Sequence, residues 1–412
     1  MSQLDDYQGC AQEIMARAEE LAHYSEMAGG LTRTYLSKQH AAAAAQITAW
    51  MSAAGMSVRR DAAGNVIGRY AGTDPSAPAL VTGSHFDSVC NGGKYDGNLG
   101  VLLPISCIAQ WHRRGRRFSF PIDIIAFAEE EGVRFKATLL GSRAVAGTFN
   151  YAVLDNLDQS GVSMRQAIVN AGFDPQQLPA AAWSAAAIKA FVEVHIEQGP
   201  LLLEQNMPVG VVTAISGATR FMVELTGLAG HAGTVPMQLR RDAAMAAAEI
   251  GLYIERRCSG VAGLVGTVGI LEVPNGAANV VPGAARFSID MRAERDEVRL
   301  AAVEDVLAEI GNITRRRHVE AILSKTHEAN SVPCDARLQE RLATAIERAG
   351  LPPVHLPSGA GHDAMAMAAI ADVAMLFVRC GNGGISHHPD EIMSVADAAL
   401  ATEVFMYFIE SF

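Results

Sequence analysis

The sequence predicts an α/β fold, with a metal-binding domain on a mostly parallel mixed sheet and a smaller α+β domain inserted into it. Three observations support this prediction. Short β-rich runs alternate with helical periodicity early in the chain, a β-α-β-β-α-β rhythm follows, and another strand pattern comes after that rhythm. The chain has 412 residues and is 50% hydrophobic, which is enough for two domains.

The first part of the chain begins with helices and continues with strands. Apolar residues recur at helical spacing in residues 10–27, and an alanine-rich segment at 40–54 ends at Gly55. β-rich runs follow at 66–70, 79–82 and 122–127, with a helical pattern at 101–111 between the last two. Strands that alternate with helices predict a sheet that is mostly parallel.

The middle of the chain has a different rhythm. The predicted elements are a strand at 221–225, a helix at 242–257, strands at 263–270 and 285–291, a helix at 294–310 and a strand at 320–323. This order predicts a ferredoxin-like α+β domain over 213–327. A helix at 338–349 and a strand at 375–379 then rejoin the first sheet, so residues 1–212 and 328–412 form one domain.

Composition and charge exclude several classes of protein. The formal net charge of −11 argues against binding to nucleic acid or to a membrane surface, because both require a basic face. Residues 1–7 carry acids and no apolar run, so we expect no secretory signal, and no stretch reaches membrane-spanning length. The six cysteines form no C-x-x-C pair, which is typical of reduced thiols. We therefore expect a cytoplasmic protein.

Two polar segments directly follow predicted strands. Gly83–Asp87 follows one strand and Glu129–Gly132 follows another, and ligand sites in such sheets lie at the carboxyl ends of strands. Three adjacent glutamates usually form a solvated helix face. Here they follow a buried apolar run, so their charge requires cations. Asp87 stands two residues after His85 and can accept the second N–H of a metal-binding imidazole.

A serine nucleophile is disfavoured. The chain has no G-x-S-x-G turn, and Ser84 and His85 are adjacent on a predicted strand, where they point to opposite faces. The histidines accompany carboxylates instead, and imidazole with carboxylate suits zinc, manganese or cobalt. A single histidine is more often a structural residue, so the prediction depends on the whole set.

The whole set resembles a known family. The motifs, in chain order, are GSHFDSV, GGKYDGNLG, AEEEGVRF, LLGSRAVAG, EVHIEQGP, GLAGHAGTVPM, GAANVVPG, SIDMR, SGAGHDAMAMA and FVRCGNGGISHHPDE. Together they resemble the amidase/hydantoinase/carbamoylase branch of the two-metal aminoacylase/carboxypeptidase superfamily, and within it the allantoate amidohydrolases. The resemblance covers nearly all of the chain.

The resemblance implies a role for each matching residue. It implies two divalent ions, manganese or zinc and possibly cobalt, with Asp96 bridging them, His85 and His195 on one, and Glu131 and His387 on the other. Glu130 matches the general base, because the base and the glutamate ligand of the family stand immediately before the glycine that matches Gly132. The triple glutamate leaves Glu129 as an alternative for either role, and His388 is the alternative to His387.

Further residues match positions that contact the substrate. His231 is the candidate oxyanion donor and Arg292 the carboxylate clamp. In the family, the residues that match His231 and Asn279 reach into the site of a partner subunit, so the resemblance implies a homodimer. Gln198, Arg220, Gly359, Ala360 and His362 match other substrate-contacting positions. A turn histidine at 231, a surface ion pair at 292, a tight turn at 359–361 and a structural hydrogen bond at His362 are the alternatives.

The predicted function is hydrolysis of a ureido C–N bond in a small anionic substrate. The resemblance favours allantoate, which would give ureidoglycine, carbon dioxide and ammonia. An N-carbamoyl-L-amino-acid amidohydrolase is the alternative, followed by an aminoacylase or peptidase. A non-catalytic binding protein would have lost ligands or the base, and every matching position is occupied.

Overall fold

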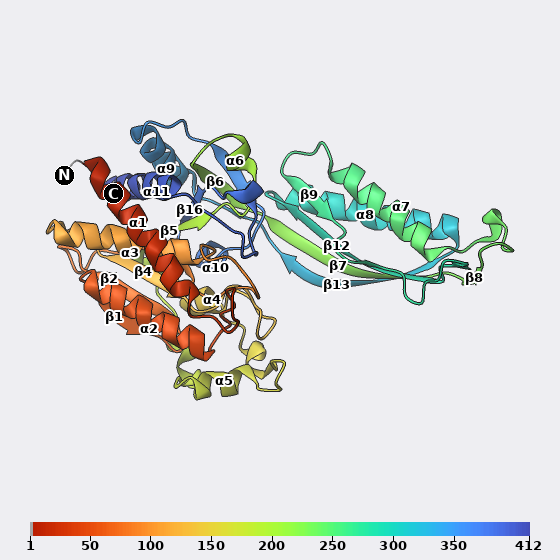
Figure 1. Cartoon of the computed structure of the whole chain (residues 1–412), viewed down its shortest axis with the longest axis horizontal. Coiled ribbons are helices and arrows are strands. Elements are labelled where there is room, and N and C mark those ends of the chain that lie inside the picture. The colour runs from red at the N-terminus through yellow and green to blue at the C-terminus, as the bar shows by residue number, and fades with distance from the viewer. Residues whose placement is uncertain (1–2) are drawn as a thin grey trace. The chain divides into compact units, whose positions relative to one another are not determined.

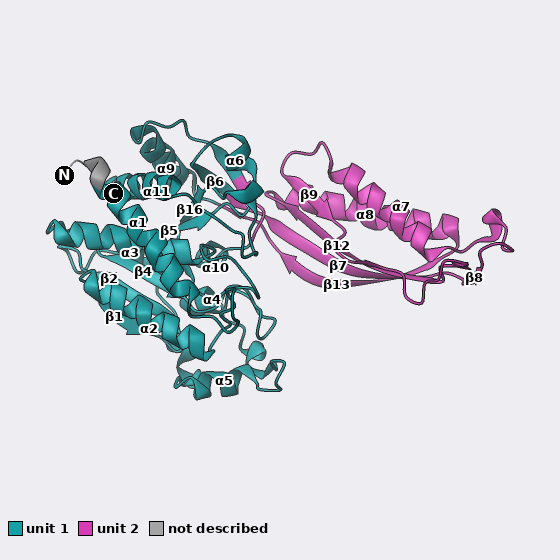
Figure 2. Cartoon of the chain, in the orientation of Figure 1, with its two compact units in different colours: residues 1–213, 334–356, 361–412 teal, residues 214–333, 357–360 magenta. Residues whose placement is uncertain are grey.

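The computed structural model describes residues 3–412, and the chain divides into two compact units (Figures 1 and 2). Unit 1 comprises the residues up to Thr213 together with Cys334–Leu356 and Gly361–Phe412. Unit 2 comprises Ala214–Pro333 and Pro357–Ala360. No helix within residues 3–412 is both long enough and apolar enough to cross a membrane.

Unit 1 is built on a mixed sheet. The strands are β1 (Ser57–Arg60), β2 (Val66–Tyr70), β3 (Ala79–His85), β4 (Ile122–Phe127), β5 (Ile188–Ile196), β6 (Val209–Ile215), β14 (Val332–Pro333), β15 (His355–Ser358) and β16 (Val373–Val378). They pair in the order β1-β2-β4-β3-β5-β16-β6-β14, with β15 also on β6. The pairs among β4, β3, β5 and β16 are parallel, whereas those of β1–β2, β2–β4, β16–β6 and β6–β14 are antiparallel. The expected mixed sheet is confirmed, and its four central strands β4, β3, β5 and β16 pair in parallel.

The central strands are almost fully buried, which explains their apolar sequences. Every residue of β3, β4 and β16 is buried. Strand β5 lies between β3 and β16 and is not among the predicted strands, because Lys189, Glu193 and His195 interrupt its apolar run. Two of these polar residues, Glu193 and His195, are themselves buried. A buried strand that carries acid and imidazole groups indicates a functional site.

Helices surround this sheet. The longer ones are α1 (Gln3–Ala22), α2 (Lys38–Ala53), α3 (Asn98–Arg113), α9 (Ala336–Arg348) and α11 (Val395–Glu410), and the shorter ones are α4 (Leu140–Val145), α5 (Met164–Asn170), α6 (Leu201–Glu204) and α10 (Asp363–Met367). Helix α3 contacts β3, β4 and β5, and α9 and α11 contact β16. Helix α1 ends at Ala22, earlier than the periodicity predicts, because Ser25 closes a turn by donating to the Gly30 carbonyl.

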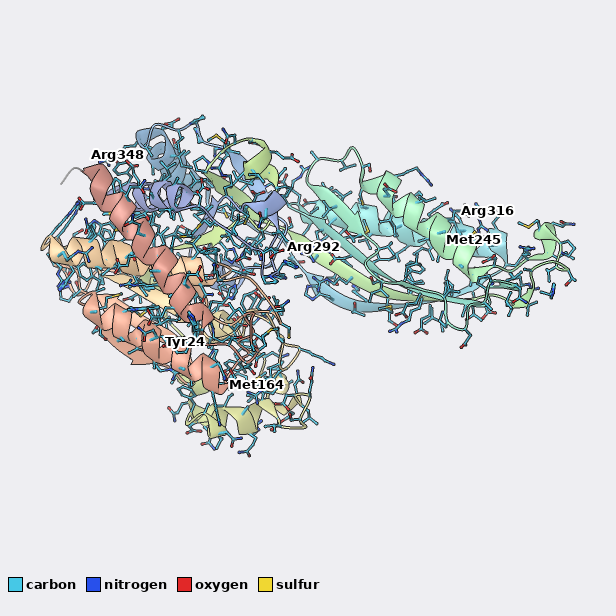
Figure 3. The ribbon with its side chains drawn as sticks, viewed as in Figure 1. Tyr24, Met164, Met245, Arg292, Arg316 and Arg348 are labelled. Atoms are coloured by element: carbon cyan, nitrogen blue, oxygen red, sulfur yellow. The ribbon has the colours of Figure 1, made fainter. Side chains whose placement is uncertain are left out.

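The sheet strands and helices of unit 2 follow the order β-α-β-β-β-α-β, with one strand more than predicted. It contains β7 (Gly217–Thr226), α7 (Ala243–Cys258), β9 (Leu264–Thr267), β10 (Leu271–Glu272), β12 (Ala284–Ala293), α8 (Asp296–Arg317) and β13 (Glu320–Ala329), with the short pair β8 (Gly230–His231) and β11 (Val280–Val281). The sheet order is β10-β12-β7-β13, with β9 also on β12. Helices α7 and α8 pack on it through a core of their own, and Met245 and Arg316 project from their exposed sides (Figure 3). The strand predicted at 263–270 is confirmed only over Leu264–Thr267, and a separate short strand follows at Leu271–Glu272.

Candidate active site

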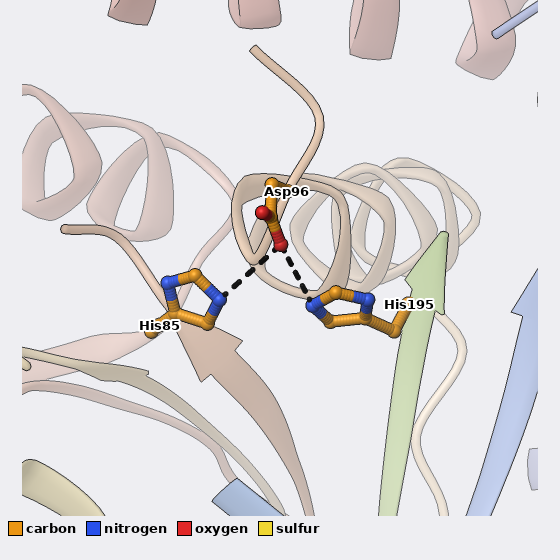
Figure 4. A group of neighbouring side chains, drawn as sticks. All are labelled: His85, Asp96 and His195. Carbon is orange, nitrogen blue, oxygen red and sulfur yellow. Dashed lines mark ion pairs between the residues drawn. The ribbon is translucent and has the colours of Figure 1, made fainter. Parts of the chain in front are cut away.

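Asp96 lies at the centre of a buried cluster of imidazole and carboxylate groups. It directly precedes the Gly97 N-cap of α3, whose φ of 65° is a conformation that glycine adopts without strain. His85 ends β3 and His195 lies near the end of β5, and these two strands are parallel neighbours. Oδ1 of Asp96 is 3.6 Å from His85 Nε2 and 3.3 Å from His195 Nε2 (Figure 4). All three side chains are buried.

The second oxygen of Asp96 faces a different histidine. Asp96 Oδ2 is 3.2 Å from His387 Nε2, which is 3.8 Å from Glu131 Oε1. The ligand atoms of His85, Asp96 and His195 lie within 4.8 Å of one another, as do those of Asp96, Glu131 and His387. One carboxylate therefore belongs to two three-residue groups. His388 is in neither group, and it lies beside Asp390 instead.

Asp87 fixes the glutamate loop that follows β4. Its carboxylate accepts the backbone N–H groups of Glu130 and Glu131 at 3.0 and 3.2 Å. His85 Nδ1 lies 3.2 Å from the Asp87 carbonyl oxygen and 3.3 Å from its carboxylate, so Asp87 also orients that ring. Glu129 is buried, and its Oε1 accepts the Gly132 N–H at 2.5 Å. Within residues 3–412, nothing donates a hydrogen bond to the Glu130 carboxylate.

Burial and like charge shape the electrostatics of this cluster. Burial raises the pKa of Asp96, but hydrogen bonds with His195, His387 and His85 outweigh it and hold the pKa well below its usual range. Burial raises the pKa of Glu130 well above its ordinary value, and burial together with the Asp96 charge does the same for Glu131. Such a concentration of buried acids is stabilised by cations.

The donor set fits two divalent ions. Glu131 Oε1 is buried, and no donor among residues 3–412 forms a hydrogen bond with it, as is expected of a ligand atom. Imidazole and carboxylate are the donors that zinc, manganese and cobalt share. His85, Glu130 and Glu131 form a further group, as do Glu193, His195 and His362. In the last of these, Glu193 already accepts the Ser84 hydroxyl at 2.6 Å and the Ala364 N–H at 2.9 Å.

Two buried carboxylates of this region are absent from the sequence predictions. Glu193 stands two residues before His195 on β5, and this spacing places both side chains on one face of the strand. Glu391 lies within the GISHHPDE segment and accepts the N–H groups of Tyr95 and Asp96. The period-two spacing in a strand was a usable signal for Glu193. For Glu391 only its place in that motif pointed to the site.

Comparison with known proteins identifies the family. Residues 81–411 match the family described as Peptidase family M20/M25/M40. The chain belongs to this family. It is 38% identical to an N-carbamoyl-L-amino acid amidohydrolase of Geobacillus stearothermophilus, over 96% of this chain and 97% of the relative. It is 40% identical to a probable allantoate deiminase of Oryza sativa subsp. japonica, over 97% of this chain and 88% of the relative.

A solved structure of a hydantoinase/carbamoylase family amidase from Burkholderia multivorans is also similar. It superimposes with a TM-score of 0.92 at 30% identity and covers 97% of each chain. This chain of the M20/M25/M40 family is therefore an amidohydrolase, an enzyme that hydrolyses C–N bonds.

Gln198 and His362 accompany the Asp96 cluster in this M20/M25/M40 member. The Gln198 side-chain amide lies 3.2 Å from Asp96 Oδ2 and 3.2 Å from His387 Nε2. Gln198 has a φ of 57°, a strained conformation that a functional position can maintain. The His362 ring is buried, with its centroid 4.5 Å from that of His195.

Unit 2 brings together two of the predicted arginines. Arg220 Nε donates to Asp290 at 2.8 Å, and Arg292 donates to both oxygens of the same carboxylate at 3.0 and 2.8 Å. Arg292 Nη1 also donates to the Gly359 carbonyl at 2.6 Å. The Ala360 N–H donates a hydrogen bond to the Ser358 hydroxyl. Arg220, Asp290, Arg292 and Gly359 line a common pocket.

The other two predicted residues of unit 2 lie at its opposite end. His231 on β8 pairs with Val280 on β11, next to Asn279, whose carbonyl accepts the Ala232 N–H. Strand β12 begins just after β11, and Arg292 stands eight residues into that strand, which corresponds to about 25 Å. Within one chain, unit 2 therefore does not bring His231 and Asn279 to the arginine pair.

Proposed function

We propose that the chain hydrolyses the ureido C–N bond of allantoate, which yields ureidoglycine, carbon dioxide and ammonia. The observation that carries the proposal is that Asp96 belongs to two ligand groups beside Glu130, whose carboxylate accepts no hydrogen bond from any of the described residues. The names of the two relatives support the substrate class. An allantoate deiminase and an N-carbamoyl-L-amino acid amidohydrolase act on molecules that carry a carbamoyl nitrogen and a carboxylate.

In this proposal, His85 and His195 hold one divalent ion, Glu131 and His387 hold the other, and Asp96 is shared. Manganese and zinc both suit this donor set, and cobalt is a further candidate. When bound, the ions supply Lewis acidity, which makes a water acidic enough to be the nucleophile near neutral pH. Asp87 keeps the His85 ring in its ligating orientation.

Glu130 is the proposed general base. Its carboxylate takes a proton from the attacking water and then gives that proton to the departing nitrogen, so one group serves both steps. The backbone hydrogen bonds from Glu130 and Glu131 to Asp87 hold the loop in place while the carboxylate itself stays available. Glu129 suits this role less well, because its Oε1 accepts the Gly132 N–H and its carboxylate belongs to none of the ligand groups.

Unit 2 is the proposed ferredoxin-like lid and dimerisation domain. Arg292 binds the substrate carboxylate, because a planar guanidinium matches a carboxylate through two parallel hydrogen bonds. Gln198, Arg220, Gly359, Ala360 and His362 are the further substrate contacts. The separation of His231 and Asn279 from Arg292 supports a homodimer in which these two residues serve the partner's site. His231 then stabilises the oxyanion.

The test is ammonia release by the manganese-reconstituted protein, assayed in parallel with allantoate and a panel of N-carbamoyl-L-amino acids. A chelated sample is the control. Chelator-sensitive release from allantoate alone supports the proposal. Release only from the carbamoyl amino acids keeps the chemistry and changes the substrate, and no release from either overturns the proposed reaction.

A further inference from the structure

Glu391 is a buried carboxylate that binds two separate parts of unit 1. Its Oε1 accepts the N–H groups of Tyr95 and Asp96 at 2.9 and 3.2 Å, and its Oε2 accepts the Ser386 hydroxyl at 2.8 Å. The side chain is 1% exposed. A Cβ atom at Gly93 would lie 2.1 Å from its carboxyl carbon, so only glycine permits this approach.

This carboxylate joins segments that are far apart in the sequence. The first contains Asp96, which belongs to both ligand groups, and the second contains His387, which belongs to one of them. Since each of the two oxygens binds one segment, a single side chain sets the distance between Asp96 and the residue before His387.

The two ligand groups differ in how the fold supports them. His85 and His195 are buried, and each is still paired within the sheet, His85 with Phe127 of β4 and His195 with Phe377 of β16. The sheet therefore fixes the backbone of both histidines. His387 lies in a loop, has a φ of 55°, and its side chain is 51% exposed. The group containing His387 therefore depends on contacts from outside the sheet.

We infer that Glu391 is a positioning residue that, through the Ser386 hydroxyl, selectively preorganises the metal position formed by Asp96, Glu131 and His387. This inference rests on the proposed function, because it requires that two ions bind. The position formed by His85, Asp96 and His195 keeps most of its affinity without this contact, because strands β3 and β5 hold its histidines. Loss of this contact should therefore lower the affinity for one ion much more than the affinity for the other.

The test is a titration of the metal-free full chain with Mn²⁺, in which free Mn²⁺ is measured by electron paramagnetic resonance. Ser386→Ala removes the hydroxyl and leaves the bonds from Glu391 to Tyr95 and Asp96. We expect one Mn²⁺ dissociation constant to rise about 10- to 100-fold, the usual cost of losing a contact that orients a ligand, while the other changes little. Ser386→Thr retains a hydroxyl and should restore the affinity for this ion.

A matched control comes from another hydroxyl–carboxylate pair of unit 1. Ser394 donates to Asp397 at 2.7 Å at the start of α11, and Asp397 is also buried. Ser394→Ala should leave both Mn²⁺ constants unchanged at a similar cost in thermal stability. Glu391→Gln serves as a second variant of the same contact.

The outcomes separate the two proposals. If the wild-type chain binds fewer than two Mn²⁺ ions, the two-ion site of the proposed function is overturned for manganese and this inference with it, whereas the proposed hydrolysis itself is decided by the ammonia assay. If the wild type binds two ions and Ser386→Ala binds both as tightly, or weakens both equally, only the role of Glu391 is overturned. Loss of one ion in folded Ser386→Ala or Glu391→Gln, with recovery in Ser386→Thr, supports it.

Discussion

Replacing Glu130 by glutamine tests the assignment of the general base. The carboxylate receives no hydrogen bond within residues 3–412, and burial raises its pKa, so the charged form costs stability in the metal-free protein. Glu130→Gln should therefore fold as well as the wild type and bind both ions. Turnover should fall about 10²- to 10⁴-fold, the range for a lost acid–base group, which corresponds to about 3–5 kcal/mol in the barrier.

Glu129→Gln is the matched comparison. The Glu129 carboxylate accepts the Gly132 N–H, and an amide oxygen can still accept that bond, so turnover should stay close to the wild-type value. Steady-state kcat, metal content by mass spectrometry and thermal unfolding should be measured on both variants. The reasoning is refuted if Glu130→Gln retains wild-type kcat with two ions bound while Glu129→Gln is inactive, because the base would then be Glu129.

Three further predictions concern the shared ligand, the dimer and a buried cation. Asp96→Asn should lower the metal content at both positions, since Asp96 belongs to both groups, and an unchanged two-ion stoichiometry would contradict this. A mixed dimer of His231→Ala and Glu130→Ala, each inactive alone, should regain roughly half of the wild-type activity, because one of its two sites is then intact; no recovery in isolated mixed dimers counts against a shared site. Arg33 is 0% exposed and donates to the Phe86 and Leu21 carbonyls and to Asn98. Arg33→Met should lower the free energy of unfolding in urea by about 3–5 kcal/mol, because it leaves these acceptors and the Asp87 charge buried without a partner. A loss below about 1 kcal/mol would contradict that account.

Local patterns predicted many elements of the fold. The largely apolar runs at 66–70 and 122–127 match β2 and β4 in full, because strands that are mostly buried need mostly apolar side chains. The same reasoning missed β5, whose Glu193 and His195 are polar because the strand supplies the site. Helix α11 was also missed. It is largely buried, so its sequence lacks the apolar stripe of an amphipathic helix.

The position of the site followed from strand ends, whereas its details depended on contacts between distant segments. His85 and the glutamate loop could be placed because both directly follow strand sequences. The contact of Glu391 with Asp96 joins residues 295 positions apart, and no local pattern encodes it. The separation of His231 from Arg292 depends on how β11 and β12 follow each other, which required strand bounds that periodicity does not give.

The insertion of unit 2 has a consequence for the order of folding. Strand β16 lies between β5 and β6 in the sheet, so on the ribosome the sheet stays incomplete until all of residues 214–333 have been synthesised. The two ends of the insertion are paired, with Val332 opposite Ile215 and Pro333 opposite Ala214. An inserted unit that folds first therefore closes a loop of about 120 residues in advance, which relieves the rest of the chain of about 4 kcal/mol of closure entropy. Early folding of the insertion would thus speed the docking of β16 onto the sheet, and with it the placement of His387, the proposed metal ligand that follows β16.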